Sequence, residues 1–255
     1  MHESIYIIIG ASRGLGASLV SKYLEKRLRV FGIGRSGEDA IEKMGAWIET
    51  GRFRYIQTDI GEPASVSIMK SIIDMYEGAP LCVIFNAAVI ESDVDDDRKI
   101  KFDTFKKVNL TGINGFGHTL EAFADYLTKY GSMLVGISSI SAWLPPVGGN
   151  KIAYPASKAY LDMALRSLRL LWGRRVHIMT VHLGHIGGKG SWFVPEYDVV
   201  AQEIVEATLS HRPPKSICMP AFYCFVSSIM RMMPDRFVSG ALGIVKGLLG
   251  RDKLQ

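Results

Sequence analysis

Short apolar runs alternate with longer stretches of helical period along most of this chain. The runs are rich in Val, Ile and Phe, and the stretches between them carry apolar residues three and four positions apart. Such alternation is typical of an α/β protein whose parallel strands are joined by helices. The expected strands span 5–9, 29–34, 54–58, 81–85, 133–138, 176–182 and 216–219, and the expected helices lie near 15–27, 63–76, 102–128, 154–172 and 199–210.

The order of these segments predicts one architecture, a Rossmann-type doubly wound parallel sheet of about seven strands with helices on both faces. The chain has 255 residues, 48% of them hydrophobic and 22% charged, which suffices for one large core. The acidic run 93–97 interrupts the pattern, and we expect it to be a solvated loop.

The C-terminal part has a different pattern. Apolar residues share one helical face over 222–233 and again over 237–249. The uncharged run 216–230 has 15 residues and contains Pro220, whereas a membrane-spanning helix needs roughly 20. We therefore expect a main unit over 1–215 and an extension over 216–255, made of a last strand and two amphipathic helices packed on that unit. Three roles stay open for the extension: a lid, a subunit interface or a peripheral membrane contact.

Charge and cysteine content bear on the expected binding partners and on the cellular location. The formal net charge is +5, and residues 222–255 carry +3 of it, a mild excess that suits a phosphate-rich cofactor as well as an acidic surface. No basic-aromatic stripe indicates nucleic-acid binding. Cys82, Cys218 and Cys224 lack C-x-x-C spacing, and no leader-like segment begins the sequence, so we expect reduced core thiols in a cytoplasmic protein.

A glycine pattern follows the first expected strand. The segment 10–16, Gly-Ala-Ser-Arg-Gly-Leu-Gly, opens the first expected helix. Unpaired backbone N–H groups and the positive end of the helix dipole meet there, and glycines let a ligand approach the backbone closely. The position therefore favours a dinucleotide pyrophosphate site over a simple tight turn.

Tyr154 and Lys158 form a second candidate pair. Their four-residue spacing places the phenol and the ammonium on one face of the helix expected over 154–172. A phenol with its ordinary pKa of about 10 is a poor proton donor at neutral pH, and a cation held close favours phenolate and lowers that pKa. The pair thus indicates general acid–base chemistry, although the same spacing also occurs in surface pairs.

Taken together, the motifs resemble the short-chain dehydrogenase/reductase family over residues 4–215. They are the glycine segment, Asn86-Ala87-Ala88 after the fourth strand, Val108-Asn109, a serine pair that ends the fifth strand, and Tyr154-x-x-x-Lys158. The resemblance implies a catalytic tetrad of Asn109, a serine, Tyr154 and Lys158. In that family the tyrosine is the acid or base, the lysine holds the nicotinamide ribose and tunes the tyrosine, the serine hydrogen-bonds the carbonyl, and the asparagine anchors a water.

The identity of the serine is open between two positions. The usual separation from the tyrosine points to Ser141, whereas alignment of the strand points to Ser139 and a loop two residues longer. We favour Ser139, because the Pro- and Gly-rich segment 143–149 that follows is able to absorb an insertion.

Residues at the end of the second strand predict the cofactor. An acidic residue there would accept from a free ribose 2′-OH, but this chain has Arg35 instead. With Arg13 it offers two guanidinium groups to a 2′-phosphate, so we expect NADP(H). Asp59 matches the family's adenine contact, and it is also placed to cap a helix beginning near Pro63. The expected cofactor-binding residues are Gly10, Ser12, Arg13, Gly14, Leu15, Gly16, Arg35, Asp59, Ile60, Asn86, Ala87, Ala88, Tyr154, Lys158 and Ile186.

The sequence departs from the family pattern in its scaffold. The segment 183–188 lacks the usual Pro and Thr, so backbone groups of Ile186 are expected to help hold the nicotinamide. Substrate contacts are expected from 143–150 and from 187–198, which contains Trp192 and Phe193, and their aromatic character suggests an apolar carbonyl compound. His182 and His185 have no third ligand spaced near them, so no metal site is predicted.

These observations predict an NADPH-dependent oxidoreductase that reduces a ketone or aldehyde, with Tyr154 as general acid. Two alternatives remain: alcohol oxidation by the same residues in reverse, and a non-catalytic dinucleotide-binding scaffold or sensor. The family resemblance also implies a homodimer or homotetramer.

Overall fold

Parallel strands form one seven-stranded sheet in the order β3-β2-β1-β4-β5-β6-β7. The computed structural model describes residues 4–37, 45–49, 51–75, 78–144, 150–188 and 194–232. Every neighbouring pair in the sheet is parallel, as the doubly wound prediction requires. The strands are β1 (Ile5–Ile9), β2 (Arg29–Gly34), β3 (Phe53–Gln57), β4 (Leu81–Phe85), β5 (Met133–Ser139), β6 (His177–Leu183) and β7 (Ser216–Met219).

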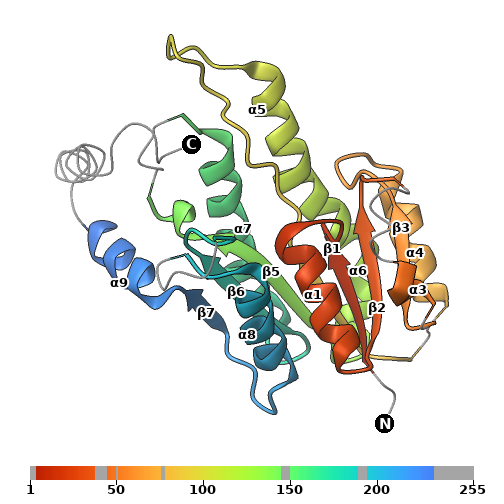
Figure 1. Cartoon of the computed structure of the whole chain (residues 1–255). Helices are drawn as coiled ribbons and strands as arrows, with labels where there is room; N and C mark the ends of the chain where they lie inside the picture. The colour runs from red at the N-terminus through yellow and green to blue at the C-terminus, as the bar shows by residue number, and fades with distance from the viewer. Residues whose placement is uncertain are drawn as a thin grey trace.

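Helices cover both faces of the sheet (Figure 1), which confirms the predicted fold class. They are α1 (Gly14–Glu25), α3 (Gly45–Ile48), α4 (Ser65–Asp74), α5 (Phe102–Asn109), α6 (Gly115–Lys129), α7 (Ala153–Trp172), α8 (Tyr197–Leu209) and α9 (Ala221–Met230). Buried residues of α1 and α8 pack with one face, and those of α4, α6 and α7 pack with the other. The five residues of β1 are all buried, because both of their faces are covered.

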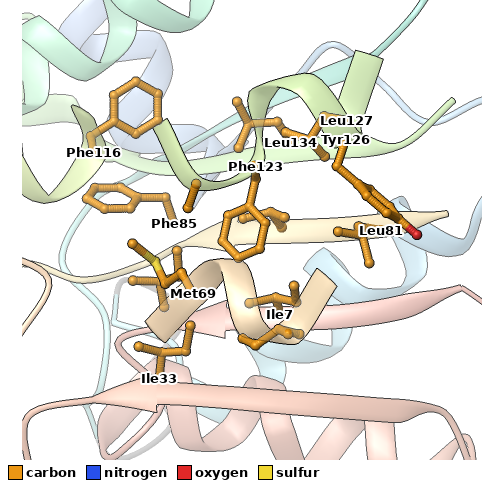
Figure 2. Packing of buried hydrophobic residues seen from close by; sticks show 14 of the residues in the cluster. Ile7, Ile33, Met69, Leu81, Phe85, Phe116, Phe123, Tyr126, Leu127 and Leu134 are labelled. Atoms are coloured by element: carbon orange, nitrogen blue, oxygen red, sulfur yellow. The ribbon is translucent and has the colours of Figure 1, made fainter. Parts of the chain in front are cut away.

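The α4–α6 side of the core is built from interlocking aliphatic and aromatic side chains (Figure 2). Met69 of α4 and Phe123 of α6 are fully buried over strand residues such as Ile7. The rings of Phe85 and Phe116 meet edge to face, with their centres 5.2 Å apart, a geometry that adds to the free energy gained from burial. This core fixes α6 against the sheet and so sets the place of the segments that follow β4.

The position of β1 beside β4 creates the crevice in which α/β proteins bind ligands. From β1 the chain proceeds outward to β2 and β3, and from β4 it proceeds outward in the opposite direction. The carboxyl ends of β1 and β4 therefore lie at the topological switch point, where the connections leave in opposite directions. The glycine segment follows the end of β1, and Asn86 follows the end of β4.

The helix expected over 102–128 is interrupted. A five-residue π-helix, Leu110–Asn114, lies between α5 and α6, directly after Asn109. Within it Gly112 lies so close to α7 that an added Cβ would stand 2.8 Å from the Cβ of Ser157. One-turn π segments inside helices occur often at functional sites, and this one adjoins the predicted catalytic asparagine.

Two expectations about polar residues are wrong. The expectation that the acidic run is solvated holds for Asp96 and Asp97, which are exposed, but is wrong for Asp93, which is only 1% exposed. Cys218 and Cys224 form a disulfide rather than two reduced thiols, because the turn after β7 brings the start of α9 back beside the strand, with the Cα atoms 6.0 Å apart. Cys82 is buried and free, as expected.

The extension begins as predicted. Strand β7 pairs with β6 at the edge of the sheet, and α9 is the first of the two expected amphipathic helices. The second, over 237–249, lies outside the described residues. Within the described part of the chain, no helix is long and apolar enough to cross a membrane.

Candidate active site

The glycine segment is held against the end of β4 by backbone contacts. The Asn86 side chain donates to the carbonyl of Gly10 over 2.8 Å. Gly10 has φ +89°, and an added Cβ would lie 2.7 Å from the Cα of Ala87. A Cβ on Gly16 would overlap the Gly10 carbonyl oxygen. Glycine is therefore required at both positions, because no side chain fits between the two segments.

The first turn of α1 is left open to an anion. Arg13 is the N-cap residue, its side chain makes no capping hydrogen bond, and the turn contains no acidic residue. Uncapped N–H groups and the helix dipole together attract phosphate. Leu15 is buried behind this turn, which keeps the backbone in place. These features fit the pyrophosphate of a dinucleotide.

Hydroxyl groups gather at the end of β2, beside the predicted adenosine subsite. The Ser36 hydroxyl donates to Ser12 over 3.2 Å, and Tyr55 donates to the Ser36 carbonyl over 3.1 Å. Burial raises the pKa of Tyr55, while its hydrogen bond with Ser12 opposes the rise. The sequence reasoning included Ser12 and missed Ser36 and Tyr55, because only the pairing of β2 with β3 brings the tyrosine to this point.

Arg35 lines a cleft of about 190 Å³. Its guanidinium is 3.8 Å from the Asp59 carboxylate, and both side chains are 41% exposed. An exposed pair at this separation is weak, so the guanidinium stays available to a phosphate. The cleft is lined by Arg35, Asp59, Gly61, Glu62, Asp103, Lys106, Lys107, Leu110 and Thr111.

The Asp59 carboxylate stabilises the turn in which it lies and does not cap α4, the helix that follows. Its carboxylate accepts from the N–H of Gly61 over 2.9 Å, and α4 begins only at Ser65, after Ala64. Ile60 is 4% exposed, and its carbonyl oxygen lies 2.7 Å from Nδ1 of His118. Both residues thus stand beside the cleft that contains Arg35, as the predicted adenine contacts would.

Ser139 is the serine that acts on the pKa of Tyr154, which burial raises and a side-chain hydrogen bond with Ser139 acts to lower. The serine is the last residue of β5, and its hydroxyl also donates to the Leu183 carbonyl over 3.2 Å. Ser141 lies in the short 3₁₀ turn after β5, and its backbone N–H donates to Ser139 over 3.1 Å. Of the two candidate serines, Ser139 is therefore the one whose hydroxyl meets the tyrosine.

The pKa of Tyr154 differs from the expectation. Burial raises it above its ordinary value, and the hydrogen bond with Ser139 opposes the rise. The predicted lowering by Lys158 is wrong for this structure, because the ammonium lies 5.7 Å from the centre of the tyrosine ring and donates elsewhere. The phenol is accordingly held in its protonated form at neutral pH.

Lys158 is a buried cation at 5% exposure. Its ammonium donates to the Ile137 carbonyl over 2.7 Å. Burial lowers the pKa of Lys158 to about 8, although the charge of Asp162 acts to raise it. Burial disfavours the charged form of an amine, so this ammonium is close to losing its proton at physiological pH.

Asn109 is the last residue of α5, at the start of the π-helix, and is partly buried. Its neighbour Val108 is 1% exposed and packs in a small cluster that includes Tyr154. The cluster ties the end of α5 to the start of α7. Asn109 is thereby brought to the same region as the tyrosine.

Asp93 holds the beginning of α7. Its carboxylate accepts from the N–H groups of Ile152 and Ala153 over 2.8 and 2.7 Å. It therefore caps the helix from a distant loop and places a negative charge at the positive end of the helix dipole. Tyr154 follows immediately. Sequence reasoning missed this residue because a cap 59 positions away leaves no local pattern.

The segment after β6 packs near the glycine segment. The Tyr197 ring lies against both Gly14 and Gly187, so a Cβ on Gly187 would overlap it. Ile186 is partly buried against the α1–α8 side of the core. Ala88 is partly buried after β4. The predicted substrate contacts in 145–149 and 189–193, with Trp192 and Phe193, lie outside the described residues.

The comparison with known families decides the class of this site. A family model described as short chain dehydrogenase matches residues 4–192. The chain belongs to the short-chain dehydrogenase family. It is therefore an oxidoreductase of this family, which uses nicotinamide dinucleotides.

Individual relatives agree with this assignment. The chain is 27% identical over 191 residues to an NADP-dependent (R)-specific alcohol dehydrogenase of Lentilactobacillus kefiri, covering 71% of this chain and 73% of the relative. It is 23% identical over 213 residues to an uncharacterized oxidoreductase of Staphylococcus epidermidis, covering 81% and 90%. A short-chain dehydrogenase structure from Streptomyces avermitilis has the same fold, with a TM-score of 0.75, 17% identity and coverage of 89% and 92%.

Proposed function

We propose that this enzyme reduces the ketone or aldehyde group of an apolar small molecule, with NADPH as cofactor and Tyr154 as general acid. The meeting of the end of β5 with the start of α7 carries the proposal: Lys158 donates to the Ile137 carbonyl, and Ser139 acts on the pKa of Tyr154. A reduced nicotinamide supplies a hydride when it is bound. The protein's own groups then have to orient the carbonyl and deliver one proton to its oxygen.

In this mechanism the two hydroxyl groups act on the same substrate oxygen. Ser139 donates a hydrogen bond to the carbonyl, and Tyr154 donates the proton that converts the developing alkoxide into an alcohol. Two fixed donors aimed at a developing charge stabilise the transition state more than the ground state. Lys158 binds the nicotinamide ribose and replaces the tyrosine proton. Asn109 holds the water that connects this pair to solvent.

The protonation state of Tyr154 at neutral pH is the one with which carbonyl reduction begins. Reduction begins with a protonated phenol, whereas oxidation begins with a phenolate. Because burial raises the pKa of Tyr154, the protonated form predominates at neutral pH. The raised pKa fits the protonated starting state of reduction but also makes the phenol a weaker acid, so the transfer depends on donation to a developing alkoxide, a much stronger base than the carbonyl oxygen. Alcohol oxidation is the same chemistry in reverse.

The preference for NADPH rests on Arg35 at the end of β2. The guanidinium pairs only loosely with Asp59 and suits a 2′-phosphate. Arg13, at the start of α1, is exposed and is the second candidate. The name of the Lentilactobacillus kefiri relative, an NADP-dependent alcohol dehydrogenase, supports the same choice.

Two measurements test the function. A panel of aliphatic and aromatic carbonyl compounds, followed by the loss of NADPH absorbance, should contain at least one substrate, and Tyr154→Phe should abolish its turnover. Titration by tryptophan fluorescence should show tighter binding of NADPH than of NADH, and Arg35→Asp should reverse the order. Equal affinities in the unaltered enzyme would contradict the role of Arg35. A cytoplasmic location, a homodimer or homotetramer, and the role of the extension stay predictions.

A further inference from the structure

A polar cluster lies between α7 and β6, outside the groups that the proposed mechanism uses. Asp162 stands one helical turn after Lys158 on α7. One oxygen of its carboxylate accepts from Nε1 of Trp143 over 3.2 Å and lies 2.9 Å from Nε2 of His182. The rings of Trp143 and His182 are tilted by 39° against each other, with their centres 4.5 Å apart. Asp162 is thus fixed by groups from two other elements.

The second oxygen of the carboxylate is buried and has no hydrogen-bond partner among the described residues. Leaving such an oxygen without a donor costs free energy. Two cations of the same helix act on this charge, since Asp162 raises the pKa of both Lys158 and Arg169. The attraction between unlike charges in a buried site offsets the cost of burying each of them.

The buried ammonium of Lys158 requires a negatively charged partner to stay protonated. Its ammonium is 5% exposed, and its hydrogen bond to the Ile137 carbonyl supplies no negative charge. A buried ammonium without a counter-charge releases its proton. The acid that acts on Lys158 is Asp162, four residues further along α7 and so on the same face of the helix.

We propose that Asp162 is a positioning residue that acts through Lys158: its carboxylate, held by Trp143 and His182, balances the buried ammonium and keeps it charged. The consequence for catalysis rests on the proposed function, because a charged Lys158 is needed there to bind the ribose and to return the proton to Tyr154. The balance itself is a property of the free protein and is measurable without a substrate.

Charged and polar groups from three elements face Asp162. From α7 these are Lys158 and Arg169, from β6 it is His182, and from the turn after β5 it is the uncharged indole of Trp143. Nδ1 of His182 lies 3.3 Å from the hydroxyl of exposed Ser216.

The test is an NMR titration of the protein labelled with ¹⁵N-lysine, with the Lys158 signal assigned by its loss in Lys158→Arg. In Asp162→Asn, which keeps the size of the side chain and removes its charge, the pKa of Lys158 should fall by on the order of one pH unit. Asp125→Asn, on the exposed surface of α6, is the matched control and should leave it unchanged. An unchanged titration in Asp162→Asn would overturn the proposal.

Trp143→Phe sharpens the result, because it removes the indole N–H and leaves the carboxylate charged. The pKa of Lys158 should then move less than in Asp162→Asn. If it moves as far, orientation by the indole matters more than the charge, and the proposal fails in its present form.

A stability cycle covers the case in which Asp162→Asn is too unstable to titrate. Lys158→Met/Asp162→Asn removes both charges and should resist urea better than Asp162→Asn alone. Equal instability of the two proteins would contradict the charge balance. Neither measurement depends on turnover, so a failed carbonyl panel would refute the proposed function and leave this inference standing.

Discussion

The two ends of the active site are built differently. At the crevice between β1 and β4 the site consists of backbone, with Gly10 and Gly16 packed so closely that a Cβ would collide with neighbouring main-chain atoms. Along α7 it consists of side chains, the partly buried Tyr154 and the buried Lys158, whose pKa values are both displaced by burial. The first end depends on shape and the second on charge, so the two should respond to different substitutions.

The largest expected effect is at the catalytic end. Tyr154→Phe removes only the phenolic hydroxyl, and loss of a general acid costs roughly 10²–10⁴-fold in kcat. Fluorescence titration should show NADPH binding close to that of the unaltered enzyme. Tyr160→Phe, at an exposed tyrosine of the same helix, is the control and should keep full activity. If both variants kept full activity, Tyr154 would have no catalytic role.

At the glycine end, Gly16→Ala should weaken dinucleotide binding more than it slows the catalytic step. The added methyl group would overlap the Gly10 carbonyl oxygen and push the segment away from Asn86. We expect dinucleotide affinity to fall by roughly 10–100-fold, equivalent to about 1.4–2.8 kcal/mol. Gly117→Ala, in open space on α6, should be neutral or stabilising. Normal binding by Gly16→Ala would show that the segment has room to adjust.

Asp93→Asn tests whether the catalytic helix depends on its distant cap. The substitution weakens two charge-assisted hydrogen bonds to the start of α7, so the free energy of unfolding in urea should fall by about 1–3 kcal/mol. Asp97→Asn in the same acidic run is the control, since among the described residues Asp97 forms an exposed ion pair with Lys99. If the free energy of unfolding fell by similar amounts in both variants, the cap at the start of α7 would make no specific contribution to stability.

A smaller effect should appear in the pH dependence of stability. The pKa of Lys158 is lowered by burial from 10.5 to about 8, so between these values the unfolded chain binds more protons at this site than the folded chain. Stability contributed by this site therefore rises as pH increases through the window. The free energy of unfolding of the unaltered protein, minus that of Lys158→Met, should increase from pH 8 to pH 10. A flat difference would contradict the lowered pKa.

Much of the framework was readable from the sequence because its signals are local. The apolar runs indicated all seven strands within a residue or two of their observed bounds, and the glycine segment indicated the turn after β1. The prediction for 102–128 found the helix and missed its π segment. That segment forms where Gly112 meets Ser157 of α7, and such a contact leaves no periodic signal.

The sequence by itself determined the order of strands and helices, the glycine turn and the spacing of Tyr154 and Lys158, because each of these depends on neighbouring residues. Only the tertiary structure decided that Ser139 meets the tyrosine, that Asp93 is a buried cap and that Cys218 pairs with Cys224. It also placed Asp162 among Lys158, Trp143 and His182. The physical reason is that a group's burial and its charged or hydrogen-bonding partners come from segments far apart in the chain, and these surroundings set its ionisation.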